Sequence, residues 1–237
     1  MLEFQRGSRP RMESHAASGP GGVYPGAPAP AHQNTLMKQK LVDYFRRIAP
    51  LSDEEAQAIL DSMVVKSCPK GTHLLMAGQV CTEAYFVLQG CVRQYYVVDG
   101  EERSNGFFTE DDWVLSIHSL MNQTPADHFL VCAEDTTVVV GNAQREQDLY
   151  RRFPRFESIS RMAMQKVLAE QQERLASYLT DSPEQRYLKL SKTRPEIFQR
   201  IPQYQLASYI GVKPESLSRI RKRIATRGKP ATPRRKA

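Results

Sequence analysis

Short runs of β-branched and aromatic residues alternate with turn signals between residues 64 and 142, and this alternation restricts the possible folds most strongly. The runs cover residues 72–76, 84–88, 92–98, 104–108, 129–133 and 136–140. Asp99 and Gly100, between two of the runs, form a dipeptide typical of a two-residue β-hairpin. Many short, regularly spaced strands predict an antiparallel barrel or jelly roll, a fold that can act as a container.

Helical patterns flank this β-rich region on both sides. In residues 36–48 the apolar side chains fall on one helix face, and Ser52 with Glu55 forms a capping box that starts a second helix. Residues 154–180 are long enough for a helix of about seven turns. Ser182 and Pro183 are typical of the start of one more helix.

The expected fold class is therefore α+β, in four segments. Residues 1–35 are rich in Gly, Pro, Ala and Ser, which predicts a disordered tail, and we hypothesise that the natural chain starts at Met37. No strand pattern follows Ile224, so a wing has to be short or lie at residues 198–201. The predicted domains are a tail at 1–35, a β-roll sensor with flanking helices at 36–153, a dimerisation helix at 154–181, and a winged-helix-like helix-turn-helix domain with a basic tail at 182–237.

The long helix carries a regular seam of larger side chains. The seam residues are spaced 4, 3, 4 and 3 apart: Met164, Leu168, Gln171, Leu175 and Tyr178. This is coiled-coil spacing, which predicts a dimer interface, but a helix that faces its own core has a similar pattern. A polar Gln171 in the seam suits either a dimer register or a contact with a ligand.

Residues 203–222 have the pattern of a helix-turn-helix. Leu206, Ala207 and Ile210 form one apolar stripe, Gly211 suits the turn, and Pro214 suits the first position of a second helix. The second helix directs its apolar positions to one side and its polar ones to the other, where we expect the DNA contacts Lys213, Glu215, Ser216, Arg219, Lys222 and Arg223. An ordinary helical hairpin with a solvated basic face remains an alternative.

The positive charge of the chain is local. Residues 213–237 contain ten Lys or Arg and one Asp or Glu, a net charge of +9, whereas the whole chain carries +7 and residues 1–212 therefore carry −2. A local basic excess on a candidate recognition helix is typical of phosphate contacts. The basic tail after the second helix has two alternative interpretations, a solvated chain end or a contact with anionic lipids.

Several classes of protein are not supported. The chain contains no run of eighteen apolar residues and no signal-peptide block, which predicts a cytoplasmic protein without a membrane span. It also lacks a nucleophile elbow, a P-loop, a dinucleotide fingerprint and a metal-ligand pair, so we do not expect an enzyme. The four cysteines lack metal-ligand spacing and are interpreted as small buried hydrophobes, with a redox role as the alternative: Cys68, Cys81, Cys91 and Cys132.

This order of β-roll, long helix and helix-turn-helix resembles the bacterial family of the cyclic-AMP receptor protein and the fumarate/nitrate reductase regulator (Crp/Fnr). The resemblance covers residues 36–224 and is most specific at residues 185–190 (QRYLKL), 206–212 (LASYIGV) and 214–221 (PESLSRIR), which are similar to a branch common in Bacteroidetes. It implies a homodimeric transcription regulator that binds a two-fold DNA site, responds to a small-molecule effector and contacts RNA polymerase.

The resemblance also assigns roles on the recognition helix. Glu215, Ser216 and Arg219 match the residues with which the family reads bases, but Pro214 stands where the cyclic-AMP receptor protein has its first Arg. Because a proline offers neither charge nor donor, the site preference of that protein is not expected here. Lys213, Lys222 and Arg223 are expected to contact phosphates.

On the effector side the chain departs from the cyclic-AMP binders. They hold the phosphate with a Gly-Glu and an Arg-Ser/Thr pair, whereas here Leu115-Ser116 and Ala126-Asp127 stand at these positions. We therefore do not expect cyclic AMP. Nor do we expect an iron–sulfur cluster, because residues 1–67 contain no cysteine. The predicted effector pocket comprises Leu115, Ser116, Asp127, Gln171 and Gln172.

Haem and a ligand in an apolar pocket are two further hypotheses for the effector. Haem has candidate axial ligands in or near the β-roll: His73, His118, His128 and Cys91. An apolar pocket is the other idea, with lining residues Trp113, Leu115, Ile117, Leu120 and Met121. The alternative overall function is a small-molecule or cyclic-nucleotide binding sensor module whose helical end mediates protein contacts.

Overall fold

The computed structural model describes residues 31–227, so most of the predicted N-terminal tail and the end of the basic tail lie outside the described residues. The helices are α1 (Ala31–Ile48), α2 (Asp53–Ser62), α3 (Ile117–Asn122), α4 (Ala143–Arg152), α5 (Arg155–Thr180), α6 (Pro183–Thr193), α7 (Ile197–Arg200), α8 (Gln203–Ile210) and α9 (Pro214–Arg227). The strands are β1 (Val64–Cys68), β2 (His73–Leu75), β3 (Glu83–Gln89), β4 (Val92–Val98), β5 (Glu101–Phe108), β6 (Trp113–Val114), β7 (Phe129–Cys132) and β8 (Thr136–Asn142). The expected α+β class is confirmed.

The described strands form two antiparallel four-stranded sheets, which together we call the β-roll. Their strand orders are β1-β8-β3-β6 and β2-β7-β4-β5. Asp99 and Gly100 both adopt positive φ in the turn between β4 and β5, as a tight hairpin with this dipeptide requires. Apolar side chains from both sheets fill the space between them, with Val87, Val92 and Leu130 completely buried. The predicted antiparallel roll is therefore confirmed.

Strands β1 and β6 and the short helices α3 and α7 were not predicted from the sequence. Strand β1 pairs with β8 along its whole length, but its residues are mostly exposed and so lack a clear alternation. Strand β6 has two residues, too few for any pattern. Residues 198–201, a candidate wing, overlap helix α7 instead, because Ile197 and Ile201 lie four positions apart and are both buried. No strand follows β8 in the described residues.

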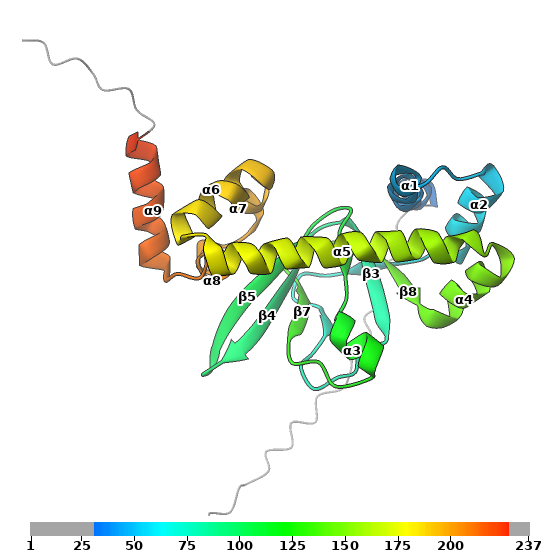
Figure 1. Cartoon of the computed structure of the whole chain (residues 1–237), viewed down its shortest axis with the longest axis horizontal. Helices are drawn as coiled ribbons and strands as arrows, with labels where there is room; N and C mark the ends of the chain where they lie inside the picture. Colours follow the sequence, from blue (N-terminus) through cyan, green and yellow to red (C-terminus); the bar gives the residue numbers. More distant parts are fainter. Residues whose placement is uncertain (1–30, 228–237) are drawn as a thin grey trace, which may run out of the picture.

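Helices α1, α2, α4 and the start of α5 cover one outer face of the β-roll (Figure 1). They share a core with Phe86, Leu88 and Val139 of the sheet. Helix α2 begins with the predicted capping box: the Glu55 N–H donates to Ser52 Oγ at 3.1 Å, and the Ser52 N–H donates to the Glu55 carboxylate at 2.8 Å. Helix α1 begins at Ala31, within the segment expected to be a tail.

Helix α5 runs across the molecule and leads to the remaining helices, α6 to α9, which we call the C-terminal helical unit (Figure 1). Its first half faces the core through Phe156, Ile159, Ala163 and Val167. None of the described helices is long and apolar enough to cross a membrane.

The C-terminal helical unit is built on an apolar cluster to which each of its helices contributes and which also includes Cys91 and Phe107 of the β-roll. Leu206, Ala207 and Ile210 of α8 are buried against Leu217 of α9, as the sequence pattern predicts. Gly211 ends α8 in the left-handed conformation, with φ of 80°, and the next N–H donates back to the carbonyl of Ala207. A left-handed residue here lets the chain turn sharply into α9.

Candidate functional site

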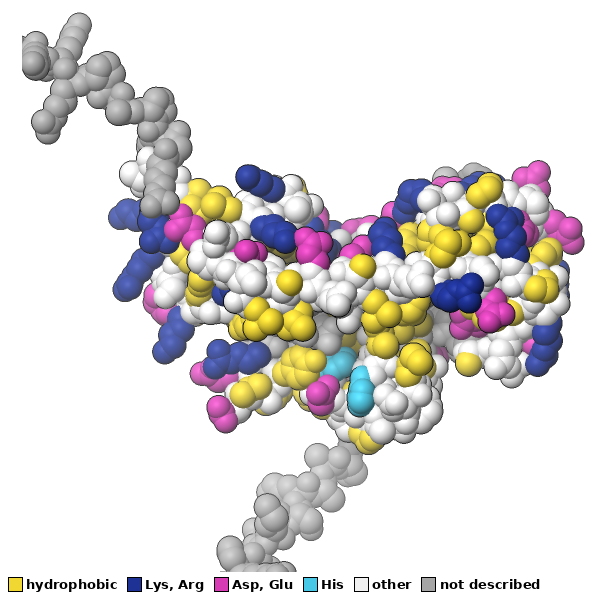
Figure 2. Space-filling model, viewed as in Figure 1, with side chains coloured by type: hydrophobic (Ala, Val, Ile, Leu, Met, Phe, Trp, Pro, Cys, Tyr) yellow, Lys and Arg dark blue, Asp and Glu magenta, His cyan; other side chains and the backbone are white. Residues whose placement is uncertain are grey.

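Helix α9 presents the predicted DNA contacts on one exposed face. Lys213, just before the helix, is exposed, as are Glu215, Arg219, Lys222 and Arg223, and Ser216 is half-buried. The opposite side is fixed to the core by Leu217 and Ile220, which are 1% and 7% exposed. The space-filling view shows Lys and Arg side chains gathered over α9 (Figure 2). The polar face is therefore held on a buried scaffold.

The charged side chains on this face are not equally available. Arg223 forms an ion pair with Glu184 in the first turn of α6. Arg219 and Lys222, by contrast, form no ion pair with any residue that the structure describes. A hollow of about 370 Å³ lies between the start of α6 and α9, and Ser216, Arg219 and Arg223 line it. Arg219 and Lys222 are therefore available to an external anion, as is the exposed Lys213, which also has no ion pair among the described residues.

The five residues predicted for the effector pocket lie in different surroundings in the single chain. Leu115 and Ser116 are buried at the start of α3, where the Ser116 carbonyl accepts the Leu120 N–H. The Asp127 side chain is 81% exposed and contacts His128. Gln172 is exposed on α5, and Gln171 lies beside a different cavity. In the single chain these residues therefore lie in different surroundings, and their grouping into one effector pocket stays a prediction.

The residues of the alternative apolar pocket also differ in their surroundings. Leu115 is in the core, whereas Met121 is 76% exposed. Trp113 belongs to the aromatic group under α1, with its ring 5.2 Å from that of Phe86. The candidate pocket residues from this segment are therefore divided between core and surface.

The candidate haem ligands lie in separate surroundings. His73 lies 3.3 Å from the Tyr95 hydroxyl, His118 lies beside Asn122, and the His128 ring lies 3.0 Å from Asp127. Cys91 is buried under the C-terminal helical unit, and this burial raises the pKa of its thiol to about 12. All four cysteines are buried and unpaired, as their structural interpretation predicts.

A cavity of about 230 Å³, here called the α1–α5 cavity, lies between α1, α5 and the turn from β5 to β6. Its lining is Tyr44, Arg47, Phe108, Asp111, Asp112, Trp113, Lys166, Val167, Glu170, Gln171 and Arg174. Apart from Gln171 and Trp113, the sequence interpretation singled out none of them for ligand binding. They come from three distant segments, and only the fold brings them together.

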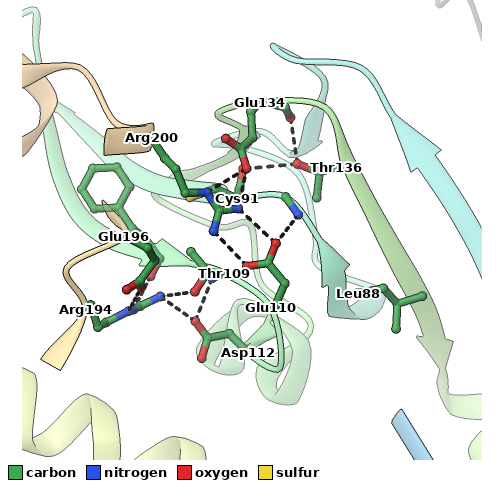
Figure 3. A network of polar contacts seen from close by, with 12 residues as sticks. Leu88, Cys91, Thr109, Glu110, Asp112, Glu134, Thr136, Arg194, Glu196 and Arg200 are labelled. Carbon is green, nitrogen blue, oxygen red and sulfur yellow. Dashed lines mark hydrogen bonds and ion pairs between the residues drawn. The ribbon is translucent and has the colours of Figure 1, made fainter. Parts of the chain in front are cut away.

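Two arginines fasten the C-terminal helical unit to the β-roll (Figure 3). Arg200 of α7 donates to Glu110 at 2.9 and 3.1 Å and also pairs with Glu134. Arg194, after α6, donates to the Phe107 carbonyl at 2.8 Å and to the Asp112 carboxylate at 3.0 Å. Neither residue was predicted from the sequence, because their partners lie 66 to 90 positions away in the chain.

The two carboxylates at this junction have opposite pKa shifts. Burial opposes ionisation of Glu110, but the hydrogen bonds from Arg200 and from the Gly90 N–H outweigh it and lower its pKa. For Asp112 burial is decisive and raises the pKa, although Arg194 and the Thr109 N–H act against it. Glu110 is thus held firmly as an anion, and Asp112 less so.

The second half of α5 exposes large apolar side chains. Leu168, Leu175, Tyr178 and Leu179 are 48%, 60%, 57% and 76% exposed, and the predicted seam residues Met164 and Gln171 are half-buried. Tyr178 also stacks under Arg186, whose guanidinium lies 4.9 Å from the ring. This part of the seam does not face the core of the chain, which removes the core-facing alternative for it.

A comparison of the chain with known protein families agrees with the observed β-roll. Residues 65–153 match the family model of the cyclic nucleotide-binding domain. The matched segment spans the β-roll from β1 to the end of α4, so this part of the chain is similar to a cyclic nucleotide-binding domain. The sequence matches none of the curated proteins.

Solved structures extend the likeness beyond this domain. The global regulator CLP of Xanthomonas campestris, described as responsive to cyclic di-GMP, is 18% identical with a TM-score of 0.58, over 75% of this chain and 93% of its own. FixK2 of Bradyrhizobium japonicum is 15% identical with a TM-score of 0.53, over 73% and 90%. A CooA mutant of Carboxydothermus hydrogenoformans is 18% identical with a TM-score of 0.54, over 72% and 79%. These neighbours are Crp/Fnr regulators, so the predicted resemblance is confirmed at the level of the fold.

Proposed function

We propose that the chain is a sequence-specific DNA-binding transcription regulator of the Crp/Fnr type, with a sensor domain that responds to a small molecule. The observation that carries this proposal is the exposed polar face of α9, on which Arg219 and Lys222 have no ion-pair partner among the described residues. A helix anchored by Leu217 and Ile220 can enter a major groove without losing its fold. Helices α8 and α9 are then a helix-turn-helix.

The proposed regulator is a homodimer that works in the cytoplasm. The exposed apolar side chains on the second half of α5 support this, because a second copy of the helix would cover them. A two-fold axis along α5 would place two copies of α9 against successive major grooves, and the site would then be two-fold as well. RNA polymerase is a further partner that the family resemblance suggests.

Within this proposal, Arg219 and Glu215 read base edges and Lys222 contacts a phosphate. An arginine can donate two hydrogen bonds to guanine, whereas a lysine at the phosphate backbone carries no sequence information. Arg223 contributes less, because Glu184 already neutralises it. Ser216 is close enough to the same face to contact a base or a neighbouring phosphate.

The test is a comparison of Arg219→Ala and Lys222→Ala on DNA. A site is first selected from a genomic fragment pool, and binding to this site and to random DNA is then measured at two salt concentrations. We expect Arg219→Ala to weaken binding to the site by about 1–3 kcal/mol and to relax one base position. We expect Lys222→Ala to weaken binding to all sequences alike and to reduce the salt slope by about one.

Arg161→Ala is the matched control, because Arg161 is an exposed arginine in the first half of α5 and is remote in sequence from α9. Its DNA binding should be that of the unaltered protein. An equal loss on specific and random DNA for Arg219→Ala would contradict base reading. Failure to recover any site, with salt-insensitive binding throughout, would contradict the DNA-binding function itself.

A further inference from the structure

The α1–α5 cavity is separate from the positions at which cyclic-nucleotide binders hold a phosphate. None of Leu115, Ser116, Ala126 and Asp127 lines it. It is bounded by α1, by the turn between β5 and β6, and by the core-facing side of α5. Its volume of about 230 Å³ has room for a small organic molecule but not for a macromolecular segment.

Three cations and three carboxylates line the cavity, but they differ in how far they are engaged by other side chains. Arg47 is neutralised by Asp111 at 2.7 Å, and Asp112 is engaged by Arg194 at 3.0 Å. The remaining charged groups in the lining are Lys166, Glu170 and Arg174. Lys166 and Arg174 thus lie beside Glu170, and the charge of Arg174 also acts on Asp112, whose pKa it lowers.

The two cations are also poorly neutralised within the protein. Lys166 lies 4.0 Å from Glu170, the limit for an ion pair, and its ammonium group lies 5.6 Å from the centre of the Tyr44 ring. Arg174 forms no ion pair with any described residue, and its guanidinium lies 5.5 Å from the centre of the Phe108 ring. A guanidinium in this position has free donors for a carboxylate or a phosphate.

The rest of the lining is aromatic and apolar. Tyr44, Phe108, Trp113 and Val167 provide these surfaces, and burial raises the pKa of the Tyr44 phenol, which keeps it a neutral hydroxyl. Aromatic walls beside fixed cations suit a planar ring that carries a negative group. A molecule with only one of these two features would use only part of the lining.

We propose that the α1–α5 cavity binds a small organic anion, a planar ring bearing a carboxylate or a phosphate, with Arg174 and Lys166 holding the negative group. This inference rests on the proposed sensor function and gives its ligand a chemical class. The ligand would lie next to Asp112, which lines the cavity. Asp112 also accepts a hydrogen bond from Arg194 of the C-terminal helical unit. Occupancy of the cavity is thereby adjacent to the contact that fastens this unit to the β-roll.

The chain offers a direct readout, because its single tryptophan, Trp113, lines the cavity. The full-length protein is titrated with phenyl phosphate, with benzoate and with the uncharged benzyl alcohol, and tryptophan fluorescence and heat are recorded. We expect saturable binding of at least one of the two anions and much weaker binding of the alcohol. The relative affinity of the two anions distinguishes a phosphate ligand from a carboxylate.

Arg174→Gln should weaken binding of the preferred anion about tenfold or more, because it removes a charge-assisted hydrogen-bond donor. Arg161→Gln, an exposed arginine of the same helix outside the cavity, is the matched control and should bind normally. Lys166→Gln is the second variant and keeps the test decisive if Arg174→Gln does not fold. Both folds are checked by circular dichroism and thermal unfolding.

Absence of saturable binding by either anion would overturn the proposal, as would unchanged affinity in folded Arg174→Gln and Lys166→Gln. Equal affinity for benzyl alcohol would mean that the cavity binds the ring without using its cations, and this result would also contradict the proposal. Because the titration contains no DNA, failure here leaves the DNA-binding function unaffected. If the protein bound the anion but not DNA, the proposed DNA-binding function would fail, and the sensor domain would act through a different partner.

Discussion

Glu110 is one of the residues that join the β-roll to the C-terminal helical unit. It accepts hydrogen bonds from Arg200 and, at 2.8 Å, from the Gly90 N–H. Gly90 has φ of 103°, and a side chain there would clash with Asp135 and Thr136 at 2.6 Å. The backbone donor is therefore available only because this position is a glycine.

Glu110→Gln is predicted to make the protein less sensitive to acid. The folded pKa of Glu110 lies below its ordinary value of 4.5, so its contribution to stability is present above that value and is lost as pH falls through the folded pKa. We expect the variant to lose about 1 kcal/mol at pH 7, because the pair is partly exposed and screened. Its unfolding free energy should also fall less between about pH 5 and pH 3.

Urea unfolding at a series of pH values checks this prediction. Glu101→Gln is the control, because Glu101 pairs with Arg103 on the surface and its side chain is 71% exposed. Asp112, with its raised pKa, contributes with the opposite sign, but it is present in both proteins and cancels in the comparison. An unchanged acid slope in Glu110→Gln would show that the carboxylate does not stabilise the junction.

At the scale of single residues, the sequence predicted those contacts whose spacing is local. The polar face of α9 follows from helical periodicity, since Leu217 and Ile220 mark the buried side. Arg174, Arg194 and Arg200 have no such signal, because an isolated arginine in a helical segment is usually solvated. Their importance comes from partners that only the tertiary fold supplies.

At the scale of elements, α5 changes its surroundings along its length. Phe156 and Val167 in the first half are buried, whereas Leu175 and Leu179 in the second half are 60% and 76% exposed. The 4-3-4-3 spacing continues through this change, so the sequence alone could not separate a core-facing helix from a dimer seam. Strand β1 is the opposite case, because the strand forms but its residues show no alternation of buried and exposed positions from which it could be predicted.

Leu175→Glu is predicted to dissociate the proposed dimer without unfolding the chain. Leu175 is largely exposed in one copy, so a charge there should cost the monomer little, but in a helix-helix interface it would be buried without a partner. We expect the dimer dissociation constant to rise by tenfold or more, as measured by sedimentation equilibrium. The same charge at Ala169, an exposed residue about 120° around the helix, should leave it unchanged. A monomeric unaltered protein would disprove the premise.

At the scale of the whole molecule, the β-roll and the C-terminal helical unit share one apolar cluster. Cys91 and Phe107 of the β-roll are buried with Ile197, Leu206 and Ile210 of the helices. Ser208 adds a polar contact, since its hydroxyl accepts the Ser104 N–H at 2.9 Å and donates to the Glu102 carbonyl at 3.2 Å. Apolar burial supplies attraction without direction, and the arginine pairs add the orientation.

This arrangement predicts that Arg200→Ala loosens the junction while the β-roll stays folded. Arg200 is the link from α7 to both Glu110 and Glu134, and its removal leaves two neighbouring carboxylates without their cation. The Ser104 amide is protected by Ser208 only while α8 is docked on β5. We therefore expect this amide to exchange with solvent about tenfold faster or more, whereas amides in the β1–β8 ladder keep their rates.

Hydrogen exchange followed by NMR or mass spectrometry measures both regions in one sample. Arg103→Ala is the matched control, because Arg103 is an exposed arginine on β5 itself and pairs only with the surface residue Glu101 among the described residues. A uniform increase over all amides would mean that Arg200 contributes to global stability instead of to the junction. Unchanged exchange at Ser104 would mean that the apolar cluster alone holds the helices in place, and the ion pairs would then have no part in fixing the orientation of α9.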